Sequence, residues 1–120
     1  MGYFFDSYAL IEMFKFTPHF EKFADEPITM TLLNLIEVTQ FFHNSQGKER
    51  AKKVTELLRG DVVEVSNNDI LKAVEFRALH KKKNVSFADS LGYIYALNHG
   101  LKFLTGDDAF KGMPNVEFVK

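Results

Sequence analysis

The stretch Tyr3-Phe4-Phe5-Asp6-Ser7-Tyr8-Ala9-Leu10-Ile11 determines how the rest of the chain is interpreted. Its aromatic run predicts a short buried strand, and the spacing of the apolar residues after Asp6 predicts a helix over residues 7–16. Asp6 therefore lies at the carboxyl end of a strand. In open parallel sheets, ligands bind beyond the carboxyl ends of the strands, which makes Asp6 a candidate site residue.

The same alternation of strand and helix patterns continues along the chain. Further strands are predicted at residues 27–30, 62–65, 102–105 and 116–119, and further helices at residues 19–24, 31–44, 48–59, 67–80 and 86–98. Gly60 is the expected C-cap of the 48–59 helix, and the 67–80 helix should bury Ile70, Leu71, Val74 and Ala78. The pattern predicts a single α/β domain over residues 1–120, with an open parallel sheet of about five strands and helices on both faces.

Composition narrows the possible functions. With no cysteine, the chain of 120 residues has no disulfide framework, no thiol nucleophile and no Cys-ligated metal site. Its apolar runs are too short to span a bilayer, and residues 1–6 lack the basic region of a secretory signal, so we expect a cytoplasmic protein. The net charge of -1 gives no global basic field. A nucleic-acid partner would therefore have to be attracted by local patches or by a bound cation.

Four acidic residues occupy positions from which they can converge. Asp6 and Asp107 directly follow predicted strands, Asp89 lies in the first turn of the 86–98 helix, and Glu37 interrupts the apolar run Leu35-Ile36-Glu37-Val38. If the sheet brings them together, their carboxylates would form the oxygen-rich site that a divalent cation requires.

Each acid also has an ordinary explanation. Asp6 could cap the first helix, Asp89 fits a capping box that begins at Ser86, and Glu37 could belong to a solvated polar stripe. Asp107 and its neighbour Asp108 could be turn residues after Gly106. These explanations account less well for four such acids at one end of the predicted sheet.

In order and spacing, the four motifs resemble those of PIN-domain ribonucleases, over the whole chain. The motifs are Phe4-Phe5-Asp6-Ser7, Asn34-Leu35-Ile36-Glu37-Val38, Ser86-Phe87-Ala88-Asp89-Ser90-Leu91 and Leu104-Thr105-Gly106-Asp107. The size of the chain is similar to that of VapC-type toxins. The resemblance implies a five-stranded parallel sheet, metal-dependent cleavage of RNA, a possible homodimer and an antitoxin protein as partner. Gly92-Tyr93 departs from the family, which usually has a second small residue there.

The expected roles follow from the coordination chemistry of magnesium, which keeps several waters and takes one or two carboxylates. We expect Asp6 and Asp89 to bind Mg²⁺ or Mn²⁺ directly, and Glu37 and Asp107 to bind through water or to hold a second cation. Four further residues are candidates to orient these acids by hydrogen bonding, although ordinary capping or surface exposure explains them equally well: Ser7, Asn34, Thr105 and Asp108.

Two other features have open interpretations. Lys81-Lys82-Lys83 could grip the RNA backbone or be a solvated helix end, and some of the phenylalanines could form a groove for an antitoxin. The alternative functions are a non-catalytic α/β binding module and a receiver-type signalling domain. The receiver-type domain would need an acidic pair after the first strand, where this chain has only Asp6.

Overall fold

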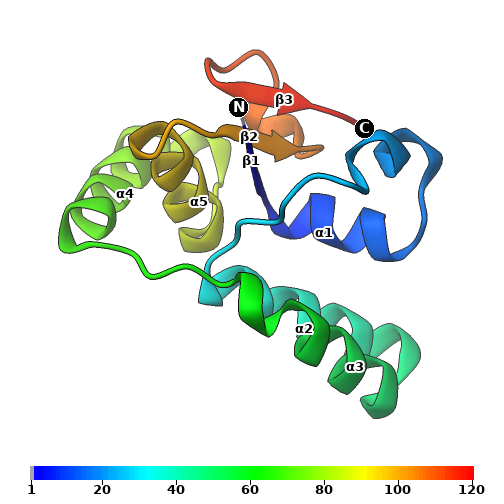
Figure 1. Cartoon of the computed structure of the whole chain (residues 1–120). Coiled ribbons are helices and arrows are strands. Elements are labelled where there is room, and N and C mark those ends of the chain that lie inside the picture. Colours follow the sequence, from blue (N-terminus) through cyan, green and yellow to red (C-terminus); the bar gives the residue numbers. More distant parts are fainter. Residues whose placement is uncertain (1) are drawn as a thin grey trace.

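The computed structural model describes residues 2–120, in which one strand is followed by five α-helices and then by two further strands (Figure 1). The strands are β1 (Tyr3–Phe5), β2 (Lys102–Thr105) and β3 (Val116–Phe118), and the α-helices are α1 (Ser7–Phe14), α2 (Leu32–Gln46), α3 (Lys48–Leu58), α4 (Asn67–Leu79) and α5 (Phe87–Asn98). Short 3₁₀ helices are η1 (Pro18–Phe23), η2 (Arg59–Asp61), η3 (Lys81–Lys83) and η4 (Asp108–Phe110).

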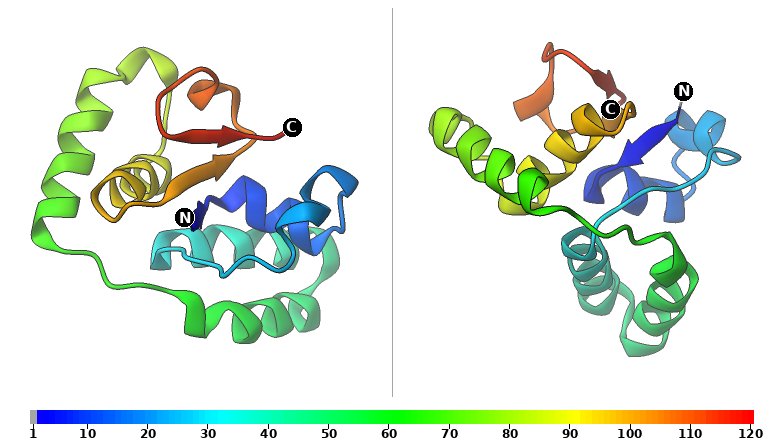
Figure 2. Two further views of the ribbon diagram at one scale, coloured as in Figure 1. Left: turned by 45° about the horizontal axis from the view of Figure 1, so that its top comes forward. Right: turned by 60° about the vertical axis from the view of Figure 1, so that its left-hand side comes forward.

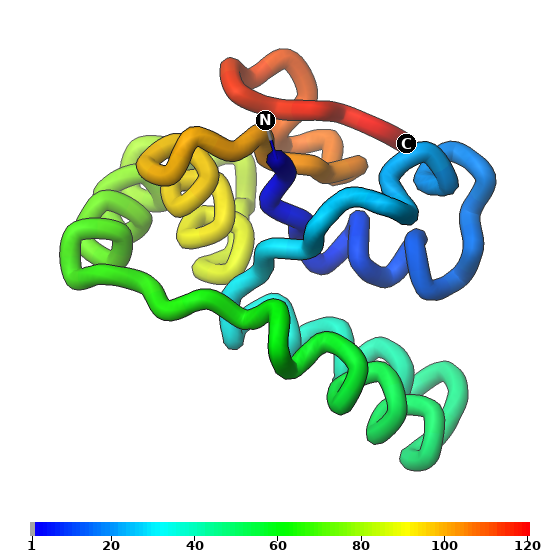
Figure 3. Tube along the Cα trace, in the orientation of Figure 1, coloured from blue at the N-terminus to red at the C-terminus, as the bar shows by residue number. Residues whose placement is uncertain are grey.

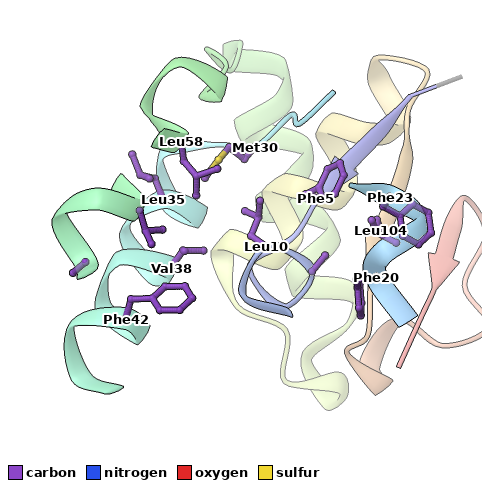
Figure 4. Close-up of a cluster of buried hydrophobic side chains, with 13 residues drawn as sticks. Phe5, Leu10, Phe20, Phe23, Met30, Leu35, Val38, Phe42, Leu58 and Leu104 are labelled. Carbon is purple, nitrogen blue, oxygen red and sulfur yellow. The ribbon is translucent and has the colours of Figure 1, made fainter. Parts of the chain in front are cut away.

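The three strands form a parallel sheet in the order β1-β2-β3. Phe4 pairs with Phe103, and Phe5 pairs with Leu104. Because successive strand residues point to opposite faces, Phe4 and Phe103 pack with α4 and α5 while Phe5 and Leu104 pack with α1, α2 and α3. The sheet therefore separates two cores, of which Figure 4 shows the one around Phe5.

The helices lie accordingly on the two faces (Figures 1 and 2). α4 and α5 cover one face, and α1 covers the other, with α2 and α3 packed beyond it as an antiparallel pair. No helix within residues 2–120 is long and apolar enough to cross a membrane.

The expected five-stranded sheet is wrong for the part of the chain that the structure describes, where three strands form. Residues 27–30 run beside β1, and residues 62–65 pass beside residues 27–30 (Figure 3). The two segments form only one isolated bridge, between Met30 and Val62. The Phe5 amide donates to the Thr29 carbonyl at 2.9 Å, and the Val63 amide donates to the Met30 carbonyl at 2.9 Å. Pro27 has no N–H to extend this pairing, so single hydrogen bonds replace a ladder.

The buried face of α4 also differs from the prediction. Asp69, Ala73 and Phe76 are buried, whereas Ile70, Leu71, Val74 and Ala78 are exposed. The Asp69 carboxylate explains why this side of α4 faces inward. It accepts hydrogen bonds from the Asn98 side chain at 2.7 Å and from the Ser66 amide at 3.0 Å. These bonds fix which side of α4 faces α5.

Smaller differences concern the helix ends. Gly60 lies within η2 and does not cap α3, whose C-cap is Arg59. Residues 18–23 form a 3₁₀ helix rather than an α-helix.

Gly92 lets α5 approach the sheet closely. A β-carbon at this position would lie 2.6 Å from Cε1 of Phe4 and 3.1 Å from Cε1 of Phe103. Only glycine leaves room for both rings. The close approach brings the first turn of α5, and Asp89 with it, toward the carboxyl ends of β1 and β2.

Candidate active site

Asp6 is the buried centre of the site. It follows β1 directly, and its amide donates to the Leu104 carbonyl at 3.2 Å, which fixes it against β2. Its carboxylate accepts from the Ala9 amide at 2.8 Å and so caps α1. Burial raises the pKa of Asp6 to about 8; hydrogen bonds from Thr105 and Ala9 oppose this rise, and the charges of Asp89 and Asp107 add to it. The Asp6 carboxyl therefore binds a proton much more readily than an exposed aspartate does.

Asp107 approaches Asp6 from the end of β2. Its amide donates to the hydroxyl of buried Thr105 at 3.0 Å, and its carboxylate accepts from the Ala109 amide at 3.0 Å. Thr105 thus contacts both acids. Gly106, between Thr105 and Asp107 in the sequence, lies so close to the Tyr8 ring and the Val119 carbonyl that no side chain fits there.

Asp89 enters the site from the first turn of α5. It forms the capping box that the sequence suggested: its carboxylate accepts from the Ser86 amide at 3.2 Å, and its own amide donates to the Ser86 hydroxyl at 3.0 Å. Partial burial raises the pKa of Asp89, and the charges of Asp107 and Glu37 raise it further. Asp89 therefore caps α5 and also interacts with the charges of the other acids.

Glu37 is held by a chain of polar side chains. The Ser7 hydroxyl donates to its carboxylate at 2.5 Å, the Asn34 amide donates to Ser7 at 3.1 Å, and the Asn34 oxygen accepts from the Thr31 amide at 3.0 Å. Asn34 is fully buried and Glu37 half-buried. These hydrogen bonds connect the start of α1 to the start of α2, so Glu37 is not part of a solvated polar stripe.

Asp108 lies apart from these four acids. Its exposed carboxylate accepts a hydrogen bond from the Lys120 ammonium at 2.8 Å, and this contact lowers the pKa of Asp108. Of the four residues expected to orient the acids, Ser7, Asn34 and Thr105 contact the site. Thr31 was missed, although a threonine N-cap with asparagine three residues later resembles a capping box.

The donor set fits a hard divalent cation chemically. Only carboxylate and hydroxyl oxygens gather here, which suits Mg²⁺ or Mn²⁺ better than metals that prefer nitrogen or sulfur. Burial is the main cause of the raised pKa values of Asp6 and Asp89, and the charges of neighbouring acids add to it. A bound cation would favour the ionised form of both carboxyls. Among residues 2–120, however, no group of three or more acidic or histidine side chains is arranged to hold an ion. Each carboxylate is instead turned toward a hydrogen-bond donor nearby.

Comparisons with known proteins agree with this architecture. The family model of the PIN domain matches residues 3–116, and no curated protein gives a significant match. A toxin–antitoxin complex from Klebsiella pneumoniae is similar in structure, with a TM-score of 0.76, 19% identity, and coverage of 97% of this chain and 96% of that chain.

Two further solved structures share the fold. VapBC2 from Rickettsia felis, bound to a DNA fragment from its promoter, has a TM-score of 0.72 and 18% identity, with all of both chains covered. Mycobacterium tuberculosis VapC20, described as a toxin that cleaves the sarcin–ricin loop, has a TM-score of 0.70 and 15% identity, with 84% of this chain and 85% of that chain covered.

Proposed function

The chain belongs to the PIN-domain family, and from this premise we propose that it is a divalent-metal-dependent ribonuclease, the toxin of a toxin–antitoxin pair. Membership of the family sets aside the receiver-type alternative. The observation that carries the proposal is the electrostatic coupling of four acids far apart in sequence. Asp6 is influenced by Asp89 and Asp107, and Asp89 by Asp107 and Glu37.

We assign the direct cation contacts to Asp6, at the carboxyl end of β1, and to Asp89, in the first turn of α5. Glu37 and Asp107 would contact the cation through water or hold a second one. When bound, Mg²⁺ or Mn²⁺ supplies charge neutralisation at the phosphate and makes nearby water more acidic.

The remaining tasks belong to the chain itself. Thr105 holds Asp6 and the backbone of Asp107 in one arrangement, and Ser7, fixed by Asn34, aims the Glu37 carboxylate. Asp6 must release its proton before it can bind a cation, so occupancy of the site should rise with pH around 8. Burial of Asp6 beneath the other acids keeps bulk water away from this carboxylate.

An antitoxin protein is the proposed partner. An open, mainly apolar pocket of about 430 Å³ lies between the end of α1 and η1, and its lining includes Phe14, Phe16, Phe20 and Ile28. Phe16 is 85% exposed. A segment of the antitoxin with apolar side chains would fit this pocket, and the complex would act in the cytoplasm.

The test is cleavage of a mixed pool of RNA by wild type and by Asp6→Asn, with magnesium, with manganese and with EDTA. We expect wild type to cut only with metal and Asp6→Asn to cut under no condition. Asp108→Asn is the matched control, because this acid lies in the same loop as Asp107 but pairs with Lys120 at the surface.

The outcomes separate the candidate functions. Metal binding without cleavage would indicate a very selective substrate. If wild type neither cuts RNA nor binds either metal, the nuclease proposal is wrong and the non-catalytic binding module is favoured.

A further inference from the structure

Phe87 is an exposed aromatic residue in the helical turn that carries Asp89. It remains 54% exposed, while its neighbours Ala88 and Leu91 are buried. A single exposed apolar side chain is ordinary on a protein surface. The surroundings of Phe87 are not ordinary, because they combine an ordered arginine, a basic turn and the acidic site.

Arg77 of α4 stacks on the Phe87 ring. The centre of its guanidinium lies 4.1 Å from the ring centroid, and its Nε donates to the Val85 carbonyl at 3.0 Å. The hydrogen bond holds the guanidinium over the ring, a cation–π contact that also fixes the ring's orientation. The pair therefore forms a rigid aromatic surface with a positive charge on it.

The segment that joins these two residues carries no acid. Residues 76–88 contain no Asp or Glu, but they contain Arg77 and the lysines of η3. The ammonium of Lys83 donates to the Ala109 carbonyl at 3.3 Å, which places η3 against η4, next to Asp107. A small cavity of about 90 Å³ is lined by Arg77, His80, Lys81, Asn84 and Val85. The basic surface thus borders the acidic site, in a protein whose net charge is -1.

The position of the ring relative to Asp89 defines what it can contact. Phe87 and Asp89 are two residues apart, which is a rise of about 3 Å along the helix. Side chains two residues apart point to different sides of a helix. The ring therefore belongs to the helical turn that carries Asp89, but it lies on another side of α5, where it contacts Arg77 of α4.

We propose that Phe87 and Arg77 form a stacking site for one base of a single-stranded RNA, with the lysines of η3 along the adjacent phosphates. This inference rests on the proposed function and adds to it the residues that position the substrate. Single-stranded nucleic acids bind by stacking bases on aromatic rings and arginine planes while cations follow the backbone. Such contacts tolerate many sequences, because every base has a π-face.

The experiment measures binding of a single-stranded RNA of eight nucleotides with 2-aminopurine near its centre, in EDTA so that the RNA stays intact. The fluorescence of 2-aminopurine is quenched when the base stacks. Phe87→Leu should weaken binding roughly 5- to 100-fold and abolish the quenching, and Phe87→Tyr should retain both. Phe16→Leu, an exposed phenylalanine beyond the far end of α1, is the matched control.

Arg77→Gln tests the charged half of the site. It should weaken binding and, because it removes a positive charge next to the phosphates, also reduce the slope of log affinity against log salt. Arg50→Gln is the control for this variant. Arg50 of α3 also lies over a phenylalanine ring, that of Phe42. Equal melting temperatures for each variant and its control would show that the fold is intact.

The two proposals fail separately. If wild type cuts the RNA pool but Phe87→Leu binds and quenches like wild type, the stacking site is wrong and the ribonuclease stands. If wild type binds and quenches through Phe87 but neither cuts RNA nor binds either metal, the stacking site stands and the nuclease is wrong. If wild type does not bind the probe, the stacking site is refuted.

Discussion

Asp6→Asn should change how the stability of the metal-free protein depends on pH. Folding raises the pKa of Asp6 from 3.8 to about 8. The protonated carboxyl therefore stabilises the fold fully below pH 3.8, and this contribution is lost as pH rises toward 8. Asparagine has a similar shape, stays neutral, and can still accept from the Ala9 amide, so its stability should not fall over this range.

The expected magnitude follows from the size of the shift. Each pH unit between the two pKa values corresponds to about 1.4 kcal/mol. Between pH 5 and pH 7.5, the free energy of unfolding of Asp6→Asn should therefore gain about 3 kcal/mol relative to wild type, or roughly 10 °C in melting temperature. This difference between two pH values is independent of any constant effect of the substitution.

The assay is urea denaturation in EDTA at several pH values, followed by circular dichroism. Asp108→Asn is the control. Contact with Lys120 lowers the pKa of Asp108, so the stability that this carboxylate contributes is fully present above pH 3.8. From pH 5 upward, the stability of Asp108→Asn should therefore change with pH in parallel with that of wild type. If the Asp6→Asn profile also parallels wild type, Asp6 is ionised in the folded protein, and the argument from burial is refuted.

Three more substitutions test other parts of the structure. Asp89→Asn keeps an acceptor for the helix cap while removing charge, so the melting temperature of the apo protein should hold or rise as RNA cleavage disappears; a fall of the size of a lost cap, about 1 kcal/mol, would contradict this. Ser7→Ala should reduce kcat by roughly tenfold with little effect on folding, because Glu37 loses its donor; unchanged kinetics would remove Ser7 from the site. Gly92→Ala should destabilise the protein by about 1–3 kcal/mol in urea denaturation, because its β-carbon meets the ring of Phe4; an unaltered midpoint would refute the close packing.

Much of the fold could be predicted from local patterns. Periodicity located the five α-helices and the three strands that form within residues 2–120, because burial on one face leaves a regular spacing of apolar residues. It could not reveal that residues 27–30 and 62–65 form single hydrogen bonds in place of strands, since strand pairing depends on a neighbouring chain. Nor could it find the buried side of α4, which Asp69 sets through Asn98.

The sequence by itself determined which acids are candidates and where they lie along the chain. Asp6 and Asp107 follow strands, Asp89 lies in the first turn of a helix and Glu37 interrupts the apolar run of another helix. These positions are local properties of the chain. Only the tertiary structure decided that Asp6 is buried and has a raised pKa, that Ser7 and Asn34 hold Glu37, and that Arg77 lies over Phe87. Burial, charge coupling and stacking act between residues far apart in sequence, and they exist only once the sheet and α5 have brought those residues together.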